Sequence, residues 1–298
     1  MNILDKNIGR LNRFQQKHRL TAFIYAVIQK SNEDDIGHRS ALLTYYGFLA
    51  LFPLLLLLST FTKIAVGNNP DLEKTINQST TDYFPVLGNQ LYTHIHGISK
   101  SGPALLFSIL FILYGTRGVA DTFRSSLRRI WQVPKSQKDS FWTAMYRSFG
   151  IIIVGGIGFV SVGLVIAMTN SAGTGIGYRT LSVVLNILLL FLIFTWLNQL
   201  SLPKKISYRH MQLGAIVAAV GLVILQYLGV YILTRELKNL DALYSYFALA
   251  LGLMFWIYLQ AQIIYFAAQV AVVSDRHLWP RSLDAKHPTD VDNQLKDA

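Results

Sequence analysis

Six long stretches of this chain contain no Asp, Glu, Lys, Arg or His, and charged segments separate them. These stretches are Ser40–Thr62, Ser101–Thr116, Ser148–Tyr178, Thr180–Pro203, Met211–Thr234 and Ala242–Ser274. Five exceed the roughly 20 residues that a helix needs to cross a bilayer, and the second reaches that length with its charged continuation. The pattern predicts an all-α membrane protein with six transmembrane helices, at about 40–63, 101–123, 145–169, 180–202, 211–234 and 243–273.

The composition supports a membrane protein, because 52% of the 298 residues are hydrophobic and only 14% are charged, against about 25% charged in soluble domains. The net charge of +11 is unevenly distributed. Six spans put both termini on one side of the membrane, and that side receives 21 of the 27 Lys and Arg residues. The positive-inside rule therefore places both termini in the cytoplasm. Because topology explains the basic excess, we expect no nucleic-acid partner.

The same pattern divides the chain into three regions. Residues 1–39 form a cytoplasmic amphipathic segment, residues 40–274 the transmembrane domain, and residues 275–298 a flexible cytoplasmic tail. At the start of the first region, Leu and Ile alternate with Lys and Arg at helical spacing, which predicts an amphipathic helix. This helix lies either on the inner leaflet or against the cytoplasmic end of the bundle. Short helices are expected on the outer surface, between the first two spans.

A line of polar residues continues from the second span into its charged extension. Arg117, Asp121 and Arg124 are spaced four and three residues apart, so they share one helical face, which Tyr114 extends into the apolar part. From a helix start near Ser101, Arg117 lies roughly 25 Å along the axis, near the far interface, where an arginine can snorkel. Two interpretations stay open: a structural charge cluster, and a site for an anionic head group.

The last span carries a polar strip with the same spacing. Tyr258, Gln262, Tyr265 and Gln269 fall on one face. Amides that lack partners in hydrocarbon cost several kcal/mol, so we expect this face to point into the bundle. There it forms either interhelical hydrogen bonds or a polar cavity shared with the residues of the second span.

The first span is interrupted by Pro53, which removes a backbone hydrogen bond and predicts a kink or hinge. Tyr45 and Tyr46 lie about two turns before it. Such tyrosines are either interfacial belt residues or lining residues of a cavity. Just before this span, the acidic residues Glu33, Asp34 and Asp35 are expected to cap its start.

Several classes of function are excluded or disfavoured. The chain has no cysteine, so disulfides and thiolate chemistry are excluded. None of its seven histidines pairs with carboxylates at catalytic or metal-ligand spacing. No nucleotide-binding motif is present either. We therefore expect no enzyme activity, no metal and no cofactor.

Four segments, taken in order, resemble a known family. They are the tyrosine-containing first span ending in LFP, YGTRGVADTFRSSLRRIWQVP, LPKKISYRHMQLGA and YSYFALALGLMFWIYLQAQIIYFAAQ. Together they are similar to landmarks of the YihY/virulence factor BrkB family of bacterial inner-membrane proteins, over roughly Ser40–Val273. The resemblance implies a six-helix membrane protein without an established activity. An older family label, tRNA-processing ribonuclease, finds no support in these residues. Where the family usually has Gly-Ala-Glu, this chain has Ala267-Ala268-Gln269, so proton coupling or ion pairing by that acidic residue is in doubt.

Two functions remain as expectations. The first is a transporter or flippase for an anionic lipid or other envelope amphiphile, with Arg117 and Arg124 attracting the head group and transport driven by a gradient or by downhill flow. The second is a non-transporting scaffold that recruits partners through the basic loop Arg117–Arg147 and the tail Asp275–Ala298. A wide cavity reaching Arg117 favours the first function, and a closed bundle favours the second.

Overall fold

The computed structural model describes residues 12, 15, 17–50, 102–134, 139–172, 176–203, 206, 208–236, 242–282, 288–289 and 291. Every regular element in these ranges is a helix, which confirms the all-α prediction for them. Besides a helix over residues 36–50, the elements are α2 (Arg19–Glu33), α6 (Gly102–Ile130), α7 (Phe141–Ala172), α8 (Ile176–Ser201), α9 (Tyr208–Glu236) and α10 (Ala242–Asp275). The predicted hinge Pro53 and the predicted outer helices fall outside the described residues.

Four helices among the described residues are long and apolar enough to cross a membrane. Their spanning parts are Phe141–Gly163, Thr180–Ser201, Arg209–Gly229 and Ala250–Asp275. They overlap the last four predicted spans, because an uncharged stretch in lipid satisfies its backbone polar groups within a helix. Helix α6 covers the predicted span at 101–123 and continues to Ile130, whereas the span at 40–63 is described only up to residue 50. The number of six spans therefore stays a prediction.

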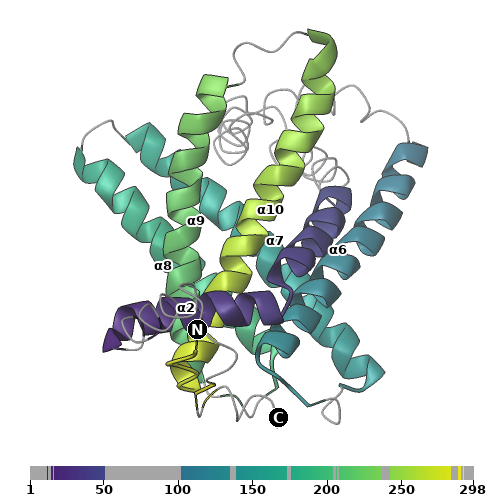
Figure 1. The fold of residues 1–298 in the computed structure, drawn as a ribbon. Helices are drawn as coiled ribbons and strands as arrows, with labels where there is room; N and C mark the ends of the chain where they lie inside the picture. Colours follow the sequence, from purple (N-terminus) through teal and green to yellow (C-terminus); the bar gives the residue numbers. More distant parts are fainter. Residues whose placement is uncertain are drawn as a thin grey trace.

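The helices from α7 to α10 pack in chain order, each against the next. Helix α6 contacts α7, α8 and α10, and helix α2 contacts α10. Figure 1 shows α2 crossing the lower end of α10, while the upper ends of α6, α8 and α10 spread apart. We call the lower end in this view the α2 end of the bundle.

Glycines allow α9 to approach α10 closely. A Cβ atom at Gly229 would overlap the ring of Trp256, and a Cβ atom at Gly214 would lie 2.9 Å from the backbone oxygen of Ala267. Gly221 lies between these two positions on the same face of α9, since seven or eight residues separate the three glycines. Small residues of this kind let helix backbones approach in lipid, where packing replaces the hydrophobic effect as the main attraction.

The α2 end contains a well-packed core. Leu127 and Ile130 of α6 and Val272 and Val273 of α10 are each at most 1% exposed. They belong to one apolar cluster that also includes Val27 of α2. The buried charged side chains of the α2 end, described below, lie beside this core.

Candidate functional site

Three arginines surround one carboxylate between α6 and α7. The Oδ2 atom of Asp139 lies 2.9 Å from Nη1 of Arg128, 3.3 Å from Nη1 of Arg147 and 3.6 Å from Nη2 of Arg124. All four side chains are only 11–15% exposed. We call these four residues the arginine cluster. With three positive charges and one negative charge, the cluster carries a net charge of +2.

Local structure explains how the arginine cluster forms. Arg124 and Arg128 lie one turn apart on α6, so both guanidinium groups reach the segment just before α7, where Asp139 lies. Arg124 also donates to the backbone oxygen of Ala144 at 2.8 Å, and Arg147 to that of Leu202 at 3.4 Å. These bonds connect α6, α7 and the end of α8. Burial nevertheless lowers the pKa of Arg124 from its ordinary value, with Asp139 opposing the shift.

The predicted pair of Arg117 and Asp121 lies on the surface of α6, about one to two turns before Arg124. Arg117 Nε is 3.5 Å from Asp121 Oδ2, and their side chains are 71% and 49% exposed. Asp121 also accepts a 2.7 Å hydrogen bond from Oγ of Ser148 on α7. Asp121 therefore borders the seam between α6 and α7 and pairs with the exposed Arg117, whereas Arg124 takes part in the arginine cluster.

The tyrosines predicted on the first span lie near α6, at Gly118. The ring of Tyr46 occupies the space next to Gly118, where an added Cβ atom would overlap it. Tyr45 packs edge-on against Tyr46, with ring centroids 5.3 Å apart, and is 52% exposed. The side chain of Tyr114 falls outside the described residues.

The polar strip of α10 forms hydrogen bonds within and between helices. Gln262 Nε2 donates to the hydroxyl oxygen of Tyr258 at 2.6 Å. Gln269 Nε2 donates to Oδ2 of Asp34 at 2.7 Å, and Gln269 is 0% exposed. Tyr265, also 0% exposed, stacks on Phe123 of α6 at a centroid distance of 6.3 Å. The two predicted glutamines thus have different partners and are not part of one common site in this structure.

A second set of charges is buried at the α2 end. Lys30 Nζ lies 2.6 Å from Oδ2 of Asp34, the same oxygen that Gln269 bonds, and the Lys30 side chain is 2% exposed. Burial lowers the pKa of Lys30 from its ordinary value, and the nearby Asp34 carboxylate opposes that shift. Arg281, with a side chain only 1% exposed, pairs with Glu33 at 2.7 Å. These contacts fasten the end of α2 to α10 and to the segment that follows α10.

Sequence reasoning missed these buried charges, because it assigned Lys30 and Arg281 to the solvated cytoplasmic side. The i,i+4 spacing of Lys30 and Asp34 is a signal that could have indicated their pairing. Nothing in the sequence pattern indicates that Gln269 is the third member.

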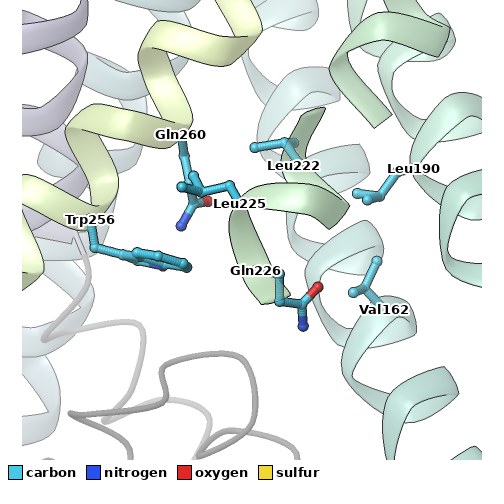
Figure 2. Close-up of a pocket in the computed structure, with 7 residues that line it drawn as sticks. All are labelled: Val162, Leu190, Leu222, Leu225, Gln226, Trp256 and Gln260. Atoms are coloured by element: carbon cyan, nitrogen blue, oxygen red, sulfur yellow. The ribbon is translucent and has the colours of Figure 1, made fainter. Parts of the chain in front are cut away.

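A small cavity lies inside the bundle, between α7, α8, α9 and α10. Its volume is about 20 Å³, enough for one water molecule. Figure 2 shows Gln226, Trp256 and Gln260 approaching the same space from α9 and α10. The lining consists of Val162, Leu190, Leu222, Leu225, Gln226, Trp256 and Gln260, and does not include Arg117.

The polar atoms around this cavity are incompletely bonded. Asn186 Nδ2 donates to Oε1 of Gln226 at 3.4 Å. The buried Trp256 Nε1 and Asn186 Oδ1 have no hydrogen-bond partner among the described residues. Sequence reasoning missed these residues as well, although amides within uncharged stretches are a usable signal for polar sites in a membrane bundle.

Comparison with known proteins identifies relatives over nearly the whole chain. A UPF0761 membrane protein of Vibrio campbellii is 27% identical over 290 residues, which cover 93% of this chain and 89% of the relative. One of Vibrio vulnificus is 26% identical over 267 residues, covering 87% and 84%. One of Psychromonas ingrahamii is 24% identical over 272 residues, covering 86% and 88%.

No solved structure matches this chain. The protein family described as "Virulence factor BrkB" matches residues 27–291, a range that includes the arginine cluster, the cavity and the buried charges at the α2 end. Its members among the relatives are named as membrane proteins, in agreement with the four apolar helices. This chain is therefore an integral membrane protein that belongs to the virulence factor BrkB family.

Proposed function

We propose that this protein is a transporter or flippase for an anionic lipid or another anionic amphiphile of the cell envelope. The observation that supports this function is the arginine cluster, in which three largely buried guanidinium groups share the carboxylate of Asp139. Excess positive charge in a partly desolvated place is unfavourable, and a bound anion would relieve it. Guanidinium groups also match phosphate oxygens in geometry, since they donate paired hydrogen bonds.

Aromatic side chains support a position of this cluster at the level of lipid head groups. Phe141, Trp142 and Tyr146 begin α7 immediately after Asp139, and they are 66%, 71% and 74% exposed. Aromatic residues are enriched at membrane interfaces, where an apolar ring meets hydrated head groups. A lipid phosphate in the same layer would be within reach of the arginines.

In this proposal, a head group moves from the arginine cluster along α6 toward Arg117. Arg117 lies seven residues before Arg124 on α6, about 10 Å along the helix axis. A head group leaving the arginine cluster along the seam between α6 and α7 would meet Arg117 next. Asp121, which both Arg117 and Ser148 contact, would compete with the head group for this cation.

A non-transporting scaffold is the second candidate, and the cavity favours it. The space in Figure 2 has room for about one water molecule and Arg117 does not line it, so within the described residues this space is too small for a lipid head group. In this proposal, the basic stretch Arg117–Arg147 and the tail Asp275–Ala298 recruit protein partners. A transporter would have to open the bundle in another conformation.

Native mass spectrometry of the purified protein tests the lipid site. We would compare the native chain with Arg147→Gln, which reduces the excess charge of the arginine cluster, and with Arg117→Ala. Arg209→Gln, at an exposed arginine at the start of α9, is the matched control. Selective retention of phosphatidylglycerol that is lost in Arg147→Gln alone or in both variants supports the site, and retention unaffected by Arg147→Gln contradicts it.

Reconstitution then separates the two functions. Vesicles containing the protein and a fluorescent phosphatidylglycerol are treated with a reductant that does not cross the bilayer. Faster loss of inner-leaflet fluorescence with the native chain than with Arg147→Gln supports transport. Retention of lipid without any translocation contradicts the transporter and supports the scaffold.

A further inference from the structure

Helix α2 has three chemically different sides. With 100° per residue, Ala22, Ala26 and Lys30 lie on the side that packs against the bundle, where each is at most 2% exposed. Leu20, Ile24 and Ile28 follow one another at intervals of four and fall within about 80° of arc, outside this buried side. They are 78%, 54% and 47% exposed, and we call them the α2 stripe.

The remaining side of α2 is polar. Thr21 and Asn32 are exposed and lie next to the α2 stripe around the helix. Two basic residues, Lys17 just before α2 and Arg19 at its first position, are exposed as well, although helical spacing does not assign them to this side. Such a helix fits the boundary between lipid and water: one side packs on the protein, the apolar side meets lipid and the polar side meets water.

The depth of α2 relative to the spanning helices agrees with such a boundary. Asp34, directly after α2, bonds Gln269, which lies six residues before the end of the spanning part of α10 at Asp275. Six residues correspond to about 9 Å of helix. Helices that lie in the membrane surface bury their apolar face about 5–10 Å deep. Figure 1 shows α2 crossing the bundle at this level.

Side chains hold α2 in this place. The hydrogen bond of Gln269 with Asp34 and the ion pair of Arg281 with Glu33 fix its end. Nearer the start of α2, the ring of Phe23 packs edge-on against the ring of Trp279, with ring centroids 6.3 Å apart. The orientation of the α2 stripe is therefore set by the bundle, and it points away from it.

We infer that α2 lies in the surface layer of the membrane at the α2 end, with Leu20, Ile24 and Ile28 among the acyl chains of that leaflet. The size of the α2 stripe favours lipid over a second copy of the chain. A stable protein interface buries roughly 1,200–2,000 Å², and three partly exposed aliphatic side chains offer only a few hundred. Their exposure in water would be unfavourable, whereas lipid covers them without any partner protein. This inference does not depend on transport.

The absence of cysteine in this chain makes a direct test possible. Single variants Leu20→Cys, Ile24→Cys and Ile28→Cys are labelled with a nitroxide and placed in vesicles of phosphatidylethanolamine and phosphatidylglycerol. Thr21→Cys and Asn32→Cys are the matched controls, because they lie on the polar side of the same helix. Power-saturation spectra measure how accessible each label is to oxygen, which concentrates in lipid, and to a water-soluble nickel chelate.

We expect a several-fold higher oxygen-to-nickel accessibility ratio at the three stripe positions than at the two controls. Nickel accessibility at position 24 equal to that at position 32 would place the α2 stripe in water and overturn the inference. Low accessibility to both reagents would show that protein covers the stripe, which also overturns it. Size-exclusion profiles identical to that of the native chain establish that the labelled variants are folded.

Discussion

Gln269 and Lys30 bond the same carboxylate oxygen of Asp34, at 2.7 Å and 2.6 Å, although α10 and α2 are far apart in the sequence. The amide of Gln269 donates to Asp34, which a carboxylate in its place could do only when protonated. The uncharged amide of Gln269 therefore suits the buried Asp34, because it can donate a hydrogen bond to the carboxylate at any pH.

Gln269→Glu should destabilise the protein at neutral pH. The substitution places a second carboxylate within hydrogen-bonding distance of Asp34, and burial leaves little solvent to screen the repulsion. We expect a loss of about 2–4 kcal/mol in the free energy of unfolding. Repulsion raises the pKa of one carboxyl in the folded state, so the loss is complete above that pKa and diminishes as pH falls through it.

Thermal unfolding in detergent at several pH values measures this effect. Gln262→Glu is the control, because Gln262 bonds the hydroxyl of Tyr258, which can donate to a carboxylate. A melting temperature of Gln269→Glu that equals the native one at every pH would contradict the buried contact.

The buried pair of Lys30 and Asp34 should show strong coupling. Lys30→Met leaves a buried carboxylate with Gln269 as its remaining partner in the network, and such a change costs about 3–5 kcal/mol. Adding Asp34→Leu removes that charge, so the double variant should recover most of the loss. A double-mutant cycle on unfolding free energies tests this, and simple additivity of the two changes would refute the coupling.

Asp139→Asn should change stability and lipid affinity in opposite directions. It removes the carboxylate that Arg124, Arg128 and Arg147 share. Repulsion then lowers the melting temperature in neutral detergent, while an anionic lipid gains affinity for the site. Phosphatidylglycerol should therefore raise the melting temperature of the variant more than that of the native chain.

Asp275→Asn is the control for that experiment, because Asp275 pairs with His210 away from the arginine cluster. If phosphatidylglycerol stabilises the native chain and both variants equally, the arginine cluster has only a structural role.

Gly118→Ala should loosen the contact between α6 and the helix over residues 36–50. The new methyl group would overlap the ring of Tyr46, and relieving such overpacking costs about 1–3 kcal/mol. Gly155→Ala is the matched control in α7, since beyond its own stretch of helix no heavy atom lies within 4 Å of its added Cβ. Thermal unfolding should show a lower melting temperature for Gly118→Ala alone, and equal values for the two variants would contradict this packing.

The sequence was sufficient to predict the apolar helices. In lipid, the backbone N–H and C=O groups must form hydrogen bonds within the segment itself, and this requirement leaves long uncharged helical stretches that are visible in the sequence. The stretches beginning at Ser148, Thr180, Met211 and Ala242 start within α7, α8, α9 and α10, respectively, and most of their described residues are helical. Helical spacing also put Arg117, Asp121 and Arg124 on one face of a helix, and in the structure Asp121 and Arg124 of this face contact α7.

Spacing could not identify the partners of these residues. The contact of Arg124 with Asp139 depends on how the segment before α7 folds back, and that of Gln269 with Asp34 on tertiary packing across 235 residues. The burial of Lys30 and Arg281 contradicts the usual preference of charges for water. Only three-dimensional packing shows that these charges compensate each other.

The buried contact between α2 and α10 also has a consequence for biogenesis. Synthesis proceeds from the N-terminus, so Asp34 leaves the ribosome 235 residues before Gln269 does. Throughout that interval, Lys30 and Asp34 lack the helix against which they are buried. The insertion of α10 therefore completes the contact surface on which α2 packs, and a nascent chain arrested before α10 would display α2 undocked to chaperones and membrane proteases.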